Sequence, residues 1–180
     1  MKKLLFVFLV AAFLIFGVAG QSLAAQTNTK TTQPLLTCNN LIPVSQIRTI
    51  VGDNTMHLTS GNEPHSSHLS PANPTTYVDC GYSSSHFYFG VTFDVYAFTQ
   101  KRWDLEKRIQ STASAITGLG SLAYRGTSVN GWGPYFVISS NKKYIIQTHI
   151  HDNKSKFDPN KKNQIQFDTI KIVDANLNKF

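Results

Sequence analysis

The residues with the clearest chemical potential are two histidines followed by a carboxylate near the C-terminal third of the chain. His149, His151 and Asp152 lie within three positions of one another. In a strand, residues i and i+2 point to one face, so this segment could offer two imidazoles and a carboxylate to a metal ion. A tetrahedral site needs a further ligand, and His65 or His68 would serve only if their proline-rich segment folds back over the strand end. The alternative is a pair of solvent-facing histidines at a strand terminus.

Two further carboxylates could support hydrolysis. Asp79 and Asp94 fall on two strands that we expect to be adjacent, which is how a glycosidase pairs its acidic groups. The sequence contains no Gly-x-Ser-x-Gly elbow and no His-Glu-x-x-His metalloprotease motif. We therefore identify no catalytic residue and expect no enzyme activity and no cofactor.

A group of lysines could bind an anionic partner. It lies around the last predicted hairpin and the start of the last predicted helix, and its candidate binding residues are Lys142, Lys143, Lys161 and Lys162, with Lys154 and Lys156 between them. The alternative is a solvated basic surface.

Helices and strands must position these residues, and the spacing of the apolar residues indicates where those helices and strands lie. The pattern predicts a short helix from 43 to 52, strands over 76–82 and 86–98, a helix over 100–115, three extended stretches over 121–126, 134–139 and 144–151, and a helix from 158 to about 176. The segment 52–75, rich in Gly, Pro and Ser, is expected to be a loop. This order predicts one α+β domain with an antiparallel sheet of about five strands covered by helices.

The second predicted strand has two faces of different character. One face is apolar and consists of Phe87, Phe89, Val91, Phe93 and Val95. Soluble domains do not leave such a face bare, so at least one helix should cover it. A set of exposed aromatic residues could line a ligand surface, and the alternative is that a covering helix makes the same residues part of the core: Tyr88, Tyr96, Trp132 and Tyr135.

The first 25 residues have the layout of a secretory signal peptide. Lys2 and Lys3 precede a long apolar run over 4–20, and the small residues Ala24 and Ala25 follow. We therefore expect a signal peptide over 1–25, a flexible Thr- and Gln-rich spacer over 26–34, and a single domain over 35–180. The mature chain then carries 15 basic and 10 acidic residues, a net charge of +5.

The expected export decides how the two cysteines, Cys38 and Cys80, are interpreted. In an oxidising compartment an even pair of this kind predicts one structural disulfide, and the alternative is two free thiols. Closing a loop of 42 residues would stabilise the fold by roughly 4 kcal/mol.

Three segments carry a resemblance to a known group. They are Cys38-Asn39-Asn40-Leu41-Ile42, Asp79-Cys80-Gly81-Tyr82, and the run over 116–124 that contains Gly118-Leu119-Gly120 and ends in Ala123-Tyr124. The chain resembles small exported proteins of Gram-positive bacteria, many of them lipoproteins, which form a family of unknown function with a PsbP-like α+β sandwich. The resemblance implies a fold and a location and no reaction. The leader lacks the lipidated cysteine common in that group.

These observations predict a non-enzymatic domain, secreted or held in the extracytoplasmic cell envelope, that binds a protein or an anionic cell-wall polymer. The alternatives are an exported metal-binding protein using the His-x-His-Asp segment and a secreted hydrolase. We expect a monomer with no nucleic-acid partner, in contact with a membrane only through the leader if the leader is retained.

Overall fold

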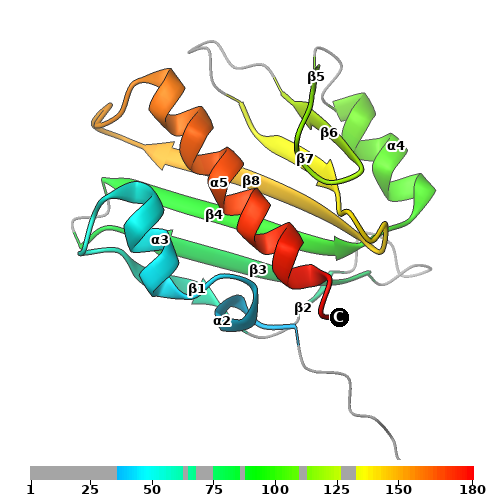
Figure 1. Ribbon diagram of the computed structural model, residues 1–180, viewed down its shortest axis with the longest axis horizontal. Coiled ribbons are helices and arrows are strands. Elements are labelled where there is room, and N and C mark those ends of the chain that lie inside the picture. Colours follow the sequence, from blue (N-terminus) through cyan, green and yellow to red (C-terminus); the bar gives the residue numbers. More distant parts are fainter. Residues whose placement is uncertain (1–35, 63–64, 68–74, 86–87, 110–112, 127–132) are drawn as a thin grey trace, which may run out of the picture. The chain divides into compact units, whose positions relative to one another are not determined.

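The computed structural model describes residues 36–62, 65–67, 75–85, 88–109, 113–126 and 133–180. Helices and strands carry the labels of Figure 1. They follow in the order α2 (Cys38–Leu41), α3 (Val44–Val51), β1 (His57–Gly61), β2 (His65–Ser67), β3 (Thr75–Ser83), β4 (Phe89–Ala97), α4 (Gln100–Ile109), β5 (Ser114–Ile116), β6 (Leu122–Arg125), β7 (Tyr135–Ile138), β8 (Tyr144–Asp152) and α5 (Pro159–Leu177). The fold is α+β, as the sequence predicts.

One antiparallel sheet organises the domain. Seven strands lie in the order β1-β3-β4-β8-β7-β6-β5, and β2 pairs with β3 beside this path. The expectation of about five strands is wrong for two reasons. The segment 52–75, which its composition predicts to be a loop, contains β1 and β2, and β5 occupies the end of the helix expected over 100–115. The residues of β1 and β5 are partly or fully exposed, so these short strands lack the apolar alternation that identifies a half-buried strand.

The first face of the sheet is covered by α2, α3 and α5, with α5 lying across the central strands (Figure 1). From β4, Phe89, Val91 and Phe93 are 1% exposed or less, and they belong to the same core as Ile165 and Ile170 of α5. The apolar face predicted from the sequence is therefore buried under helices. Phe87, the first residue of that predicted face, lies outside the described residues.

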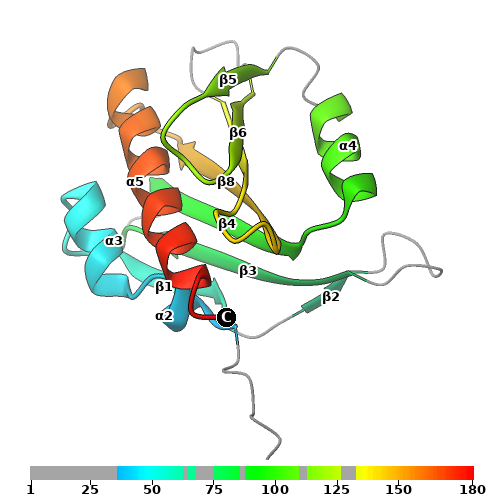
Figure 2. The same cartoon turned by 45° about the vertical axis from the view of Figure 1, so that its right-hand side comes forward.

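The second face is the face that carries Asp79 and Asp94, and α4 covers part of it. Trp103 of α4 is 4% exposed and packs against Tyr124 of β6 and Phe136 of β7, with ring centroids 5.8 Å away in both cases. This makes a second, smaller core. Turning the molecule shows α4 on the side of the sheet opposite α5 (Figure 2).

The predicted disulfide is present. Cys38 and Cys80 are joined with their Cα atoms 5.6 Å apart, and both are fully buried. The bond attaches α2 to β3 and adjoins β1, where a Cβ on Gly61 would lie 2.9 Å from Cys38 Sγ and 1.7 Å from the carbonyl oxygen of Asp79. Only glycine fits this position, which also has a φ of +89°.

The predicted end of the first helix and the predicted start of the last are where the sequence places them, whereas α4 spans Gln100–Ile109 and not 100–115. Gly52 ends α3 in the left-handed conformation, and the Asp158 side chain caps α5 by accepting from the backbone N–H of Lys161 at 2.9 Å. Within the described residues, no helix combines the length and apolar character needed to cross a membrane.

Candidate functional site: a pocket on the second face of the sheet

The second face carries a pocket of about 430 Å³ where α4 leaves the sheet uncovered. Its walls come from β1, β3, β4 and the first turn of α4: Ser60, Tyr77, Asp79, Thr92, Asp94, Tyr96 and Arg102. The strand residues of this set alternate with core residues such as Val78 and Phe93, so the period of two that buries one face presents these side chains on the other.

Asp79 and Asp94 form the floor of the pocket. They are direct partners in the antiparallel β3–β4 ladder, and both are half-buried. Directly opposite residues in such a ladder have Cβ atoms about 4.5–5.5 Å apart. Burial, followed by the negative charge of Asp79, raises the pKa of Asp94 to about 6, although a hydrogen bond with Tyr96 acts in the other direction.

An aromatic and arginine stack forms the wall beside the carboxylates. The rings of Tyr77 and Tyr96 are stacked with centroids 5.3 Å apart, and the guanidinium carbon of Arg102 lies 4.0 Å from the centre of the Tyr96 ring. Arg102 Nη2 also pairs with Glu106 Oε1 at 2.6 Å, one turn along α4. Because Glu106 is 5% exposed, this ion pair is largely desolvated. Arg102 therefore has an ion-pair partner within α4, and its charge also partly offsets the rise that burial causes in the pKa of Asp94.

The aspartates have no equivalent match. Among the described residues, no Lys, Arg or His forms an ion pair with Asp79 or Asp94. The site thus combines hydrogen-bond acceptors, excess negative charge and an aromatic wall in a cavity of the size that holds small ligands. It can bind donor groups, and at mildly acidic pH it can hold a proton on Asp94.

The structure separates the three residues of the metal hypothesis. His149 and His151 share the second face, opposite Thr92 and Gly90 of β4. Burial, and then the neighbouring His151, lowers the pKa of His149. Asp152 is the next residue along β8 and is not directed to that face. No group of three His, Cys, Asp or Glu side chains is arranged to hold a metal in the described part of the chain.

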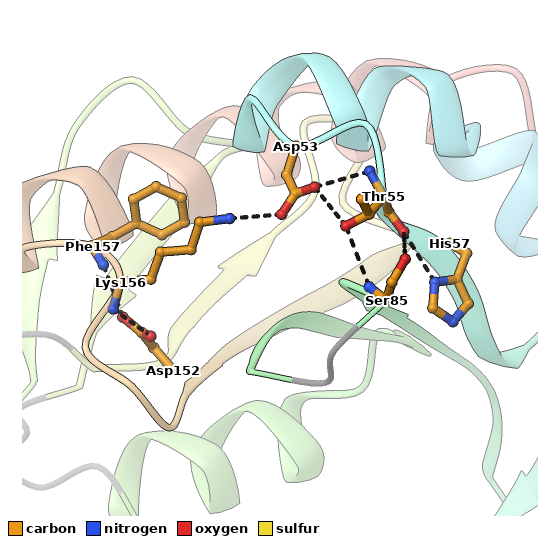
Figure 3. Close-up of polar contacts among 7 residues, drawn as sticks. All are labelled: Asp53, Thr55, His57, Ser85, Asp152, Lys156 and Phe157. Atoms are coloured by element: carbon orange, nitrogen blue, oxygen red, sulfur yellow. Dashed lines mark hydrogen bonds and ion pairs between the residues drawn. The ribbon is translucent and has the colours of Figure 1, made fainter.

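Asp152 instead organises the loop between β8 and α5. Its carboxylate accepts from the backbone N–H groups of Lys156 and Phe157 at 2.8 and 3.1 Å (Figure 3) and pairs with Lys162 Nζ at 3.0 Å. Burial alone would raise the pKa of Asp152, but these hydrogen bonds and the lysine charge together lower it. Asp152 is thus a structural residue. Of the other proposed ligands, His65 lies in β2 and His68 lies outside the described residues.

The same loop is tied to the start of β1 by a polar network (Figure 3). Lys156 Nζ contacts Asp53 Oδ2 at 2.6 Å, and Asp53 Oδ1 accepts from the N–H and hydroxyl of Thr55 at 2.9 and 2.6 Å. Ser85, in the β3–β4 turn, donates its N–H to the Thr55 hydroxyl at 3.3 Å. Three loops at one end of the sheet are therefore linked, which is a structural arrangement.

The lysines proposed as an anion-binding group do not gather in one place. Lys142 and Lys143 occupy the β7–β8 turn, where Lys143 Nζ donates to the carbonyl of Phe180 at 3.2 Å, while Lys161 and Lys162 lie in the first turn of α5. The β7–β8 turn is hydrogen-bonded to Leu177 at the end of α5, about 24 Å along the helix from Lys161. Lys162 is also 5% exposed and paired with Asp152.

Two of the four aromatic residues expected to be exposed are buried. Tyr96 is 9% and Tyr135 4% exposed, because Arg102 covers the first and the second faces the core under α5. Tyr88 is 43% exposed, with Lys154 Nζ 3.4 Å from the centre of its ring. Trp132 lies outside the described residues. Of the three residues of this set that the structure describes, Tyr88 alone is exposed.

The Ser-x-x-Lys spacing, which some serine hydrolases use, occurs at Ser139 and Lys142 and again at Ser140 and Lys143. All four residues lie between β7 and β8, and the Ser139 hydroxyl donates to the Asn141 side chain at 2.7 Å. The Ser140 hydroxyl is hydrogen-bonded to Asp174, and its backbone N–H donates to the same carboxylate at 2.7 Å. This serine has a structural partner and is not beside the pocket.

Sequence reasoning missed the α4 part of the pocket. Arg102 and Glu106 are spaced i and i+4 on a helix that also carries the buried Trp103, and that spacing is the signal of an ion pair on one side of the helix. Ser60 and Thr92 carried no signal, because a single hydroxyl on a strand is common.

Comparison of the chain with protein-family models, with curated proteins and with solved structures finds no match.

Proposed function

We propose that this chain is an exported domain of the bacterial cell envelope that acts by binding, and that its binding site is the pocket on the second face of the sheet. The observation that carries the proposal is the pairing of Asp79 with Asp94 on the floor of a 430 Å³ pocket. A folded domain avoids placing like charges directly opposite each other, because the arrangement is destabilising. A ligand that donates hydrogen bonds to both carboxylates would offset their repulsion and would explain why the arrangement is present.

The proposed location has separate support. The buried disulfide between Cys38 and Cys80 is typical of proteins outside the reducing cytoplasm. The signal-peptide layout of residues 1–25 agrees with it. The likeness to exported Gram-positive proteins with a PsbP-like sandwich belongs to the same proposal, which the α+β fold and the single disulfide support.

The proposed partner is a component of the envelope. The sequence favours a protein or an anionic polymer. The separation of Lys142 and Lys143 from Lys161 and Lys162 gives an anionic polymer no single basic surface among these candidate residues. The pocket therefore favours a partner that presents hydrogen-bond donors, such as a protein.

Filling the pocket tests this function. Thr92 lies within the pocket on β4, and Thr92→Trp would occupy it with a residue that strands accept. Ser114→Trp, on the exposed strand β5, is the matched control. The purified full-length protein is mixed with isolated bacterial envelopes and sedimented, and the bound fraction is measured over a range of protein concentrations.

We expect the wild type and Ser114→Trp to bind alike and Thr92→Trp to bind about tenfold more weakly. No sedimentation of the wild type, or equal binding by Thr92→Trp with circular dichroism unchanged, would overturn the proposal.

A secreted hydrolase is a second candidate because of one observation. Asp94 has a pKa of about 6 beside a second carboxylate, which is the pairing of a general acid with a nucleophile or base in glycoside hydrolysis. Assays for reducing ends released from cell-wall glycans, at about pH 5 to 7, decide between the two. Release by the wild type that is lost in Asp94→Asn would favour the hydrolase.

A further inference from the structure

We propose that the pocket on the second face binds an organic cation, an ammonium or guanidinium group held between Asp79 and Asp94. This rests on the proposed function and names the class of group that the same site takes. The group could belong to a small amine or to a Lys or Arg side chain of a polypeptide.

The charges around the pocket point to a cation. Asp79 and Asp94 repel each other across the β3–β4 ladder. Arg102 is the one basic residue among the described pocket walls; it is paired with Glu106 at 2.6 Å, and its charge also partly offsets the rise that burial causes in the pKa of Asp94, so one positive charge stands against two carboxylates in the pocket walls. A cation between the two aspartates would remove their repulsion. Its binding free energy at this site would therefore be more favourable than that of a neutral ligand.

The size of the pocket points to an organic cation and not to a bare metal ion. A volume of about 430 Å³ suits a small organic ligand. A metal ion would require several ligands at about 2.0–2.6 Å, and no group of three His, Cys, Asp or Glu is assembled in the described part of the chain. An ammonium group brings three donors and a guanidinium five, with looser geometric demands.

The walls supply the remaining acceptors. Ser60 and Thr92 place hydroxyl groups in the pocket beside the carboxylates. The Arg102 guanidinium already lies on the Tyr96 ring at 4.0 Å, so that ring face is occupied. The cation is therefore held by oxygen atoms and not by an aromatic cage.

Binding should be coupled to pH through Asp94. The groups that face it are Asp79 on β3, Tyr96 on its own strand, and Arg102 and Glu106 on α4. On β8, Gln147 lies opposite it and does not titrate, and His149 lies diagonal to it on the same face, with a pKa that burial lowers. Because the pKa of Asp94 is about 6, it is largely ionised at pH 7 and about one-tenth ionised at pH 5.

The test uses calorimetric titration of the full-length, disulfide-bonded protein. The probes are 1,5-diaminopentane, a Gly-Lys-Gly peptide with blocked termini, and the same peptide with the lysine acetylated. The variants are Asp79→Asn and Asp94→Asn. Asp168→Asn on α5 is the control, since it removes the same charge from the opposite side of the sheet.

We expect the amine or the lysine peptide to bind and the acetylated peptide to bind at least about tenfold more weakly. Binding by the diamine alone would indicate a small ligand, and stronger binding by the peptide would indicate a polypeptide. Each pocket variant should lose about tenfold in affinity, and Asp168→Asn should lose little. The wild-type affinity should fall about tenfold from pH 7 to pH 5, and Asp94→Asn should lose this dependence.

Equal affinity for the lysine and acetyl-lysine peptides, or full affinity in both pocket variants, would overturn the proposal that the pocket binds a cation. If no cationic probe binds while Thr92→Trp still weakens envelope binding, the cation proposal fails and the binding function stands. If neither experiment gives binding, both fail.

Discussion

Asp79 and Asp94 are partners across the β3–β4 ladder, and both carboxylates point to the face of the sheet that α5 does not cover. The opposite face of the same two strands is apolar and buried. One strand pair therefore serves both the core and the candidate site, and removing the Asp94 charge on the pocket face should affect stability in the opposite direction from truncating an apolar side chain on the core face.

Replacing Asp94 with asparagine should stabilise the protein at neutral pH. The folded-state pKa of about 6 lies above the usual 3.8, so the unfolded chain releases this proton first, and stability falls as pH rises from about 4 to about 6. An asparagine side chain at this position has no charge to bury, so we expect a gain on the order of 2 kcal/mol at pH 7 and little change at pH 4. Urea melts of the wild type and of Asp94→Asn at the two pH values measure this change in the free energy of unfolding. A loss of stability in the variant at pH 7 would contradict the burial argument.

Asp53 should have the opposite pH dependence. Hydrogen bonds from Lys156 and Thr55 lower its pKa from 3.8 to about 2. Its contribution to stability is therefore complete above about pH 4 and is lost as pH falls from about 4 to about 2. Because Lys156 is 43% exposed, we expect Asp53→Asn to lose only about 1 kcal/mol at pH 6. Denaturation melts should show that the free energy of unfolding of Asp53→Asn differs from that of the wild type at pH 6 and is almost the same at pH 2.

The disulfide should carry a large part of the stability. Cys80→Ala removes the link between α2 and β3 and should lower the free energy of unfolding by roughly 4 kcal/mol. Mass spectrometry of the non-reduced wild type should show Cys38 joined to Cys80. Free thiols in the folded protein, or an unchanged melt of the variant, would be evidence against this role.

Aromatic truncations on β4 should follow burial. Phe93 is fully buried under the helices, and Phe93→Ala should cost roughly 3–5 kcal/mol. Tyr96 is covered by Arg102 on the other face, so Tyr96→Ala should also be costly. Tyr88→Ala, at an exposed position, should cost less than about 1 kcal/mol. Chemical denaturation of the three variants checks this order, and an equal loss for Tyr88→Ala would show that its environment is not the one described.

The sequence predicts those helices, strands and bonds that depend on a local pattern or on the residue types themselves. The apolar alternation of β4, the Asp158-Pro159 start of α5 and the Cys38–Cys80 pair each depend on local pattern or on residue type. Gly120, in the glycine-rich segment after β5, lies where the chain approaches a neighbouring strand closely, since a Cβ there would be 2.1 Å from the Ile138 carbonyl oxygen.

The pocket could be predicted only in part. Asp79 and Asp94 are expected on adjacent strands, but their pairing depends on the turn between them, and a shift of one residue would move one carboxylate to the other face. Arg102 and Ser60 enter the pocket because of how α4 and β1 dock, and docking of this kind has no local signature. The structural role of Asp152 has no signal in the sequence, because the backbone N–H groups that donate to it lie in the loop that follows it.

The most direct test of the binding site is to locate a bound ligand by NMR. Amide signals of the ¹⁵N-labelled protein are followed while solubilised envelope extract is added. We predict that the signals of Asp79, Thr92 and Asp94 move together and that those of α5 stay in place, and that Thr92→Trp abolishes the movement. Shifts confined to α5 or to the β7–β8 turn, with the pocket signals unchanged, would contradict the account.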